Sequence, residues 1–135
     1  MPANPKTVLA LDYGDKRIGL AIASLDAKLP RALDTLSTTT PLETIKDITL
    51  KENVSQIVVG YPRGLNGQTT AQTSAVDEFI KRLAAAVNLP IDKQDESLTS
   101  RKAELELNSR GKAYTRADID ALSAIYILED WLKDR

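Results

Sequence analysis

Two apolar runs near the start of the chain are separated by only three residues. They cover residues 7–13 and 17–24, with Gly14-Asp15-Lys16 between them. So short a polar connection predicts that the two runs pair as a hairpin. A third run at 31–37, which follows Pro30, predicts another strand beside them. The chain is therefore expected to begin with an antiparallel meander.

After residue 40 helical and extended patterns alternate. Thr40-Pro41-Leu42-Glu43 combines a capping Thr, a first-turn Pro and a Glu three residues on, which predicts a helix from there to about residue 53. Apolar periodicity predicts strands at 55–60 and 90–95, and helices at 71–88, 99–109 and 117–133. The order β-β-β-α-β-α-β-α-α predicts the α/β class, with a mixed five-stranded sheet flanked by helices. This is the layout of an RNase H-like fold, built as a single domain over residues 1–135.

Composition limits the chemistry that is available. The 135 residues contain neither Cys nor His, which excludes Cys/His zinc sites, Cys nucleophiles, Ser–His–Asp triads and disulfides. Lys plus Arg number 18 and Asp plus Glu 19, so binding to a polyanion requires a local basic patch. The sequence has no apolar run long enough to span a membrane and no secretory signal at its N-terminus, which predicts a cytoplasmic protein. Carboxylates that hold a hard metal ion are the simplest catalytic machinery that remains.

Acidic residues fall at the ends of predicted elements. Asp12 closes the first strand, Asp95-Glu96 closes the last strand, and Asp118 and Asp120 lie in the first turn of the final helix. Clustered carboxylates repel one another unless a cation compensates them, and two Mg²⁺ or Mn²⁺ ions at such a cluster would support phosphodiester hydrolysis. Each acid also has a plain structural interpretation. A strand-end Asp before Gly often serves a turn, first-turn acids complement the helix dipole, and Asp95-Glu96 could cap the next helix.

Basic residues offer a local surface for phosphates. The segment 101–116 contains five basic and two acidic residues, and Arg63 lies in the Gly-rich loop 60–67. The candidate nucleic-acid contacts are Lys16, Arg17, Arg63, Arg110, Lys112 and Arg116. A charged run of this kind is also common on an ordinary solvated face. The glycine spacing at 14–19 is not a phosphate loop, because Leu20 stands where that motif requires Lys.

Several segments, in order along nearly the whole chain, resemble the YqgF/RuvX family of pre-16S rRNA nucleases, which is related to RuvC-type Holliday junction resolvases. They are Leu-Asp-Tyr-Gly-Asp-Lys-Arg-Ile-Gly-Leu-Ala at 11–21, Ile-Val-Val-Gly-Tyr-Pro at 57–62 with Asn66-Gly67, Asp-Glu-Ser-Leu-Thr-Ser at 95–100, and Ile-Asp-Ala-Leu-Ser-Ala at 119–124 with Ile127-Leu128.

The resemblance implies an RNase H-like fold and a Mg²⁺- or Mn²⁺-dependent nuclease that trims the 5′ end of precursor 16S rRNA in the cytoplasm. It places the acidic metal site on Asp12, Glu96 and Asp120, with Asp95 as an adjacent auxiliary acid. Ser97 stands where the family usually has Arg, so a phosphate contact would have to come from another cation.

Three other functions stay open beside cleavage of structured RNA. One is cleavage of branched DNA, and another is a catalytically weak RNA-binding assembly factor. The third is a phosphotransferase of the actin or sugar-kinase type, which needs two such domains where 135 residues supply one. The chain is expected to act as a monomer or a weak dimer.

The final helix carries two candidate acids. At about 100° per residue, Ala121, Ala124, Ile125, Leu128 and Leu132 form one apolar stripe. Asp118 and Asp120 lie on opposite flanks of this stripe, so periodicity alone does not choose between them. The family resemblance favours Asp120 as the metal ligand and leaves Asp118 as an acid that complements the helix dipole.

Overall fold

The structure is a computed structural model that describes residues 5–39, 41–62, 71–96, 99–133 and 135; the side chains of residues 71, 96 and 99–101 fall outside that description. Its elements follow the predicted order. The strands are β1 (Thr7–Tyr13), β2 (Arg17–Ser24), β3 (Arg31–Ser37), β4 (Val54–Pro62) and β5 (Ile91–Glu96). The helices are α1 (Pro41–Lys51), α2 (Ala71–Ala86), α3 (Thr99–Ser109) and α4 (Arg116–Leu132).

The strands form one mixed sheet in the order β3-β2-β1-β4-β5. β1 pairs antiparallel with β2, and β2 pairs antiparallel with β3, which confirms the predicted meander. β4 and β5 add to the other side of β1 in parallel. The predicted bounds of the first three strands match the structure, whereas β4 is longer than expected because it continues through Gly60 to Pro62.

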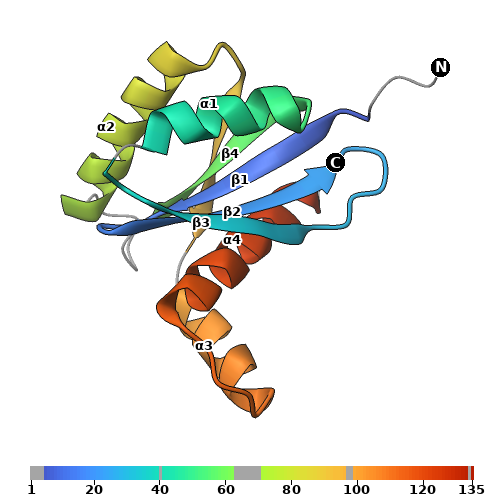
Figure 1. The fold of residues 1–135 in the computed structure, drawn as a ribbon, viewed down its shortest axis with the longest axis vertical. Helices are drawn as coiled ribbons and strands as arrows, with labels where there is room; N and C mark the ends of the chain where they lie inside the picture. Colours follow the sequence, from blue (N-terminus) through green and yellow to red (C-terminus); the bar gives the residue numbers. More distant parts are fainter. Residues whose placement is uncertain (1–4, 40, 63–70, 97–98, 134) are drawn as a thin grey trace.

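Helices cover both faces of the sheet (Figure 1). α1 and α2 lie over one face, where they pack on residues such as Leu9 and Leu11 of β1. α4 crosses the other face and packs on Val8 and Ala10 of the same strand. Successive residues of β1 therefore alternate between the two layers, as the period of a strand requires. The predicted arrangement of a mixed sheet flanked by helices is confirmed.

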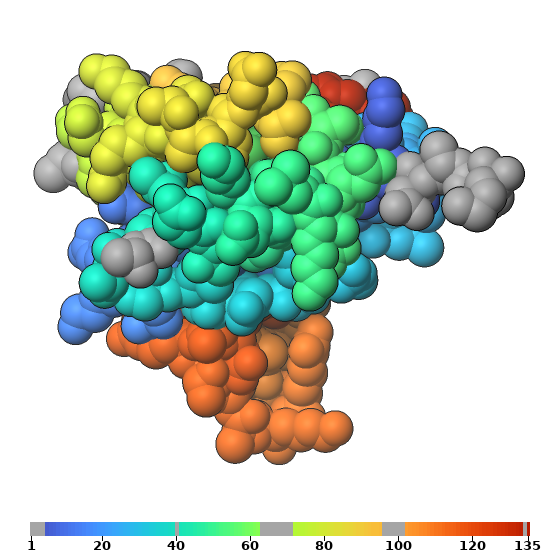
Figure 2. Space-filling model, turned by 45° about the horizontal axis from the view of Figure 1, so that its top comes forward, coloured from blue at the N-terminus to red at the C-terminus, as the bar shows by residue number. Residues whose placement is uncertain are grey.

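α3 packs against α4 and lies away from the sheet (Figure 1). The two helices share a small core of their own, made by Ala103, Leu107, Ile119, Leu122 and Tyr126. In Figure 2 this end of the molecule, in orange, projects beyond the body formed by the sheet, α1 and α2.

The buried surface of α4 is wider than the predicted stripe. Ala121 and Ile125 are only half-buried, whereas Ile119, Leu122 and Tyr126 are buried. The prediction was too narrow because α4 packs against α3 as well as against the sheet, so two sides of the helix are covered. In the described part of the chain, no helix is both long and apolar enough to cross a membrane.

Candidate active site

Asp12 lies on the face of the sheet that α4 covers. Its neighbour Leu11 packs under α1 and α2, and Ala10 packs under α4, so the alternation of the strand directs Asp12 toward α4. Asp12 pairs directly with Gly19 of β2, and Gly19 pairs with Thr35 of β3. These three residues form a row across the sheet, beneath the first turns of α4.

Gly19 allows α4 to approach the backbone of the sheet. A Cβ atom at this position would lie 2.1 Å from the carbonyl oxygen of Asp120 and 2.4 Å from its carbonyl carbon. No side chain larger than a hydrogen fits there while the helix keeps its place. The Thr35 hydroxyl adds a 3.0 Å hydrogen bond to the Ala117 carbonyl. The row thus positions the start of α4 and brings Asp120 beside the strand that carries Asp12.

Asp120 forms an ion pair with Arg17, the first residue of β2. Arg17 Nε donates to Asp120 Oδ2 at 2.6 Å, and the two side chains are 35% and 19% exposed. The backbone of Arg17 is fixed by the β1–β2 turn, in which the Gly14 N–H donates to the Arg17 carbonyl at 2.9 Å. A charge-assisted contact between partly buried groups is stronger than an exposed ion pair. Arg17, predicted to contact nucleic acid, is therefore engaged with a predicted metal ligand.

Asp118 has a different, structural role. Its carboxylate accepts from the Thr115 backbone N–H at 2.9 Å, while its own N–H donates to the Thr115 hydroxyl at 3.3 Å. This reciprocal pair is a capping box at the N-terminus of α4. The structure thus separates the two acids, with Asp118 in the cap of α4 and Asp120 toward the sheet, and the role of Asp120 as a metal ligand stays a prediction.

The two described acids of β5 do not share one face. The Asp92 carboxylate accepts from Trp131 Nε1 of α4 at 3.0 Å, which places Asp92 on the α4 side. Asp95, three residues on, falls on the opposite side and pairs in the sheet with Tyr61, which belongs to the core under α1 and α2. The pleat of β5 therefore directs Asp95 away from the face that carries Asp12. The backbone of Glu96 ends β5 opposite Pro62, and its side chain lies outside the described residues.

Three of the predicted phosphate contacts gather beside Asp120. Lys16, Arg17 and Arg116 line a hollow of about 350 Å³ together with Gly14, Asp15 and Asp120. The hollow thus combines three cations with two carboxylates at the end of β1, where the predicted acid cluster begins. It is a surface on which a phosphate group could approach the acids.

Two other basic residues of the segment 101–116 lie apart from this hollow. Arg110 and Lys112 line a second hollow of about 330 Å³ near Asp118, between α3 and α4. Arg110 also pairs with Glu106 at 2.9 Å. These residues separate because the α3–α4 connection projects away from the sheet (Figure 1). Arg63 lies outside the described residues.

A polar cluster anchors the ends of β4 and β5 to α2 on the opposite face. The Tyr61 hydroxyl donates to Asp77 Oδ2 at 2.9 Å, and Lys93 Nζ donates to Asp77 Oδ1 at 2.9 Å. Lys93 also lies 4.5 Å from the centre of the Tyr61 ring. The hydrogen bonds from Lys93 and Tyr61 hold the pKa of Asp77 below its ordinary value. These contacts tie β4 and β5 to α2 on the face of the sheet opposite to α4.

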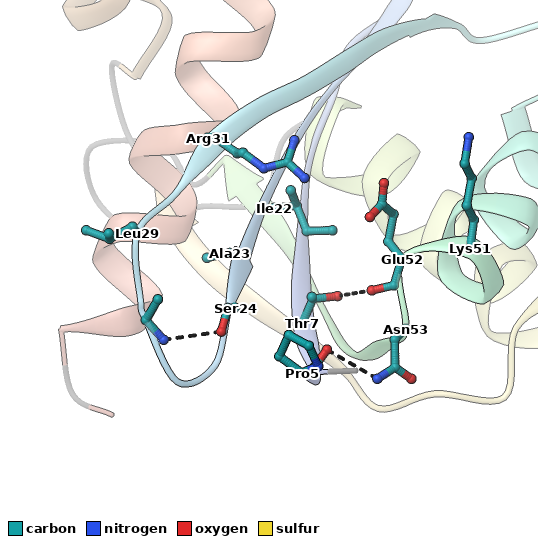
Figure 3. A pocket seen from close by; sticks show the side chains of 11 residues that line it. Pro5, Thr7, Ile22, Ala23, Ser24, Leu29, Arg31, Lys51, Glu52 and Asn53 are labelled. Atoms are coloured by element: carbon teal, nitrogen blue, oxygen red, sulfur yellow. Dashed lines mark hydrogen bonds between the residues drawn. The ribbon is translucent and has the colours of Figure 1, made fainter. Parts of the chain in front are cut away.

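Another hollow, of about 370 Å³, lies at the far end of β1 and β2 from the acids (Figure 3). Thr7 and Ser24 mark those strand ends, and Arg31 and Glu52 bring opposite charges into it. The Thr7 hydroxyl donates to the Glu52 carbonyl at 2.9 Å, which ties β1 to the end of α1. This hollow contains none of the predicted site residues.

The donor set at the Asp12–Asp120 position suits a hard divalent cation. Both groups are carboxylates, and Mg²⁺ and Mn²⁺ prefer oxygen ligands. The Asp120 side chain is 19% exposed, so a cation from solvent can reach this carboxylate. Among the residues whose side chains are described, no group of three acids is gathered closely enough to hold a metal. A third ligand would have to come from outside that set, where Glu96 stands.

Two features of this site were not predicted from the sequence. The first is the contact of Gly19 with α4, although an isolated Gly inside an apolar strand is a recognised signal for close backbone approach. The second is the pairing of Arg17 with Asp120, which are 103 residues apart along the chain. No local pattern in the sequence signals that pair.

Comparisons with known proteins agree with the fold. The sequence model of the RuvX family, described as Holliday junction resolvase, matches residues 6–134. A relative from Chloroflexus aggregans, named "Putative pre-16S rRNA nuclease", is 36% identical over 98% of this chain and 96% of its own length. A relative of the same name from Porphyromonas gingivalis is 35% identical over 93% of this chain and 94% of its own length.

Solved structures share the architecture at low sequence identity. RuvC of T. thermophilus, in complex with a Holliday junction substrate, superposes with a TM-score of 0.60 at 15% identity, over 96% of this chain and 95% of that chain. The Holliday junction resolvase of fowlpox virus gives 0.58 at 12% identity, over 96% and 99%. These likenesses confirm the RNase H-like fold, and the sequence matches extend over almost the whole chain. The chain therefore belongs to the RuvX family of nucleases.

Proposed function

We propose that this protein is a divalent-metal-dependent endonuclease that cleaves structured RNA, with the 5′ end of precursor 16S rRNA as its substrate. The observation that carries the proposal is that Asp12 and Asp120 both lie next to Gly19 on one face of the sheet, Asp12 as its strand partner and Asp120 through the backbone of α4. A basic hollow lies directly beside Asp120. Carboxylates next to a phosphate-binding surface are what metal-assisted phosphodiester hydrolysis requires.

Asp12, Asp120 and Glu96 would hold Mg²⁺ or Mn²⁺, since the chain has no Cys or His with which to bind a softer metal. Two such ions would supply the activation of a water molecule and the stabilisation of the leaving oxygen. The protein's own contribution is to fix the carboxylates. β1 positions Asp12 through its pairing with β2, and the Gly19 contact positions Asp120.

Phosphate binding would fall to Lys16 and Arg116, which line the hollow beside Asp120. With a net charge of −1, the chain has no general attraction for nucleic acid, so this local patch has to supply it. Asp15 lines the same hollow and lowers its positive potential. We therefore expect weak binding to unstructured nucleic acid, with a shallow dependence on salt because few phosphates are contacted.

The choice of RNA rests on the names of the relatives, which refer to pre-16S rRNA. A second candidate is branched DNA, because the family description is Holliday junction resolvase. An RNA substrate of this kind would place the reaction in the cytoplasm. The auxiliary role expected of Asp95 is not retained, since β5 turns this residue to the other face of the sheet.

The test is a cleavage assay with purified protein and two labelled substrates, a precursor 16S rRNA 5′ leader and a four-way DNA junction. We expect cleavage of the RNA with Mn²⁺ or Mg²⁺, none with a chelator, and none in the Asp12→Asn variant. Asp47→Asn is the matched control, because Asp47 is an exposed Asp of α1, on the opposite side of the sheet. Cleavage of the junction alone would favour the DNA function. Binding of RNA without cleavage under all conditions would identify an assembly factor.

A further inference from the structure

We propose that Arg17 is an internal counter-cation for Asp120 that a divalent metal ion must displace. This inference rests on the proposed function, because it assumes that Asp120 is a metal ligand. Arg17 Nε lies 2.6 Å from Asp120 Oδ2, which is a direct charge-assisted hydrogen bond. The guanidinium thus occupies one of the two carboxylate oxygens through which a metal would bind.

The position of the Arg17 backbone is set by the strand and its turn, independently of Asp120. The backbone of Arg17 accepts from Gly14 at 2.9 Å, and it pairs with Ser37 at the start of the β2–β3 ladder. Gly19, two residues on, faces α4, so the alternation of β2 turns the Arg17 side chain to the same face. The pairing of β2 in the sheet therefore places the Arg17 guanidinium beside Asp120.

The ion pair is not what holds α4 on the sheet. The start of α4 is already fixed by the capping box of Thr115 and Asp118, and by the hydrogen bond from Thr35 to Ala117. Gly19 allows the backbone contact at Asp120. Since these contacts dock the helix, the charge of Arg17 acts mainly on the Asp120 carboxylate.

A metal ion and the guanidinium oppose each other at this carboxylate. An ion on either oxygen of Asp120 would stand close to the positive charge of Arg17, and like charges in a partly buried site repel strongly. The Asp120 side chain is 19% exposed, so solvent screens this repulsion only in part. Without metal, Arg17 instead neutralises the charge of the Asp120 carboxylate. With a metal ion on Asp120, the guanidinium would turn toward the hollow that it lines with Lys16 and Arg116.

The test measures Mn²⁺ binding to the full chain without nucleic acid, by titration calorimetry and by the paramagnetic resonance signal of free Mn²⁺. We expect Arg17→Gln to bind Mn²⁺ roughly three- to tenfold more tightly than the wild type, since a partly exposed ion pair of about 1 kcal/mol no longer competes. The matched control is Lys16→Gln, which removes the same charge from the same hollow. We expect it to change the affinity by less than about twofold, because exposed charges are screened.

The outcomes separate the inference from the proposed function. If the wild type binds Mn²⁺ and Asp12→Asn does not, the metal site stands. Equal or weaker binding by Arg17→Gln would then overturn the counter-cation role and make Arg17 a residue that orients Asp120 for the metal. An equal gain in Lys16→Gln would also overturn it, since general charge and not the ion pair would be responsible. A wild type that shows no Asp12-dependent binding refutes the metal site itself, and the inference with it.

Discussion

Replacement of Gly19 by Ala tests how the fold brings the two acids together. The added Cβ would lie 2.1 Å from the Asp120 carbonyl oxygen, whereas ordinary contacts begin near 3.4 Å. The difference between these two distances means that α4 or β2 has to move by about 1.3 Å. The obstacle is backbone and not the end of a flexible side chain, so no rotamer change relieves it.

The expected cost has two parts. Overpacking of this kind destabilises a fold by about 1–3 kcal/mol, and we place Gly19→Ala at the upper end because Gly19 is buried against backbone. Displacement of a functional group by about 1 Å can reduce a rate by about 100-fold. We therefore expect the variant to lose about 2–3 kcal/mol in urea unfolding, and to lose most of its metal-dependent cleavage at temperatures where it remains folded.

Gly111→Ala is the matched control. Gly111 has a φ of +71° and nothing within 4 Å of an added Cβ, so Ala there strains the backbone without a clash. We expect it to cost about 1–2 kcal/mol and to leave cleavage within a fewfold of the wild type. If Gly19→Ala were as stable and as active as the wild type, the close approach of α4 to β2 would be refuted, and with it the placement of Asp120 beside Asp12.

Three further outcomes follow from the structure. Asp120→Asn should abolish cleavage and leave the fold intact. Asp118→Asn should lower the free energy of unfolding by about 1 kcal/mol, because it disrupts the capping box, and should keep the cleavage rate within a fewfold of the wild type. The reverse pattern in paired activity and unfolding assays would assign the metal ligand to Asp118. Burial, together with a smaller effect of the hydrogen bond with Glu106, raises the pKa of Tyr126 to about 12. The unfolded chain then loses this proton first, so stability should fall as the pH rises from about 10 to about 12, and Tyr126→Phe should flatten that part of the pH profile; an unchanged profile would contradict burial as the cause of the shift. Neutralisation of Arg116, near Asp120, should lower the slope of log affinity against log salt by about 0.7–0.9. Neutralisation of Arg110 and Lys112, beside Asp118, should lower this slope less, as filter binding with RNA at several salt concentrations would show.

The sequence by itself determined the order of elements and the place of Asp12. Short connections and the period of each apolar run are local properties, and they predicted the first three strands to the residue. They also placed Asp12 at the end of β1, where its face follows from the alternation of its neighbours. The capping box of Thr115 and Asp118 is also a local contact, but the sequence pattern predicted only a helix-dipole role for Asp118, and the structure revealed the cap.

Only the tertiary structure decided which side chains meet. Asp95 and Glu96 are adjacent in the sequence, yet the pleat of β5 turns Asp95 away from Asp12. The basic segment 101–116 divides because α3 and the α3–α4 connection lie away from the sheet, whereas α4 packs on it, which leaves Arg116 near Asp120 and Arg110 apart from it. The pair of Arg17 and Asp120 joins residues 103 positions apart. Such contacts depend on how far a helix sits from a sheet, and at Gly19 a single missing Cβ sets that distance.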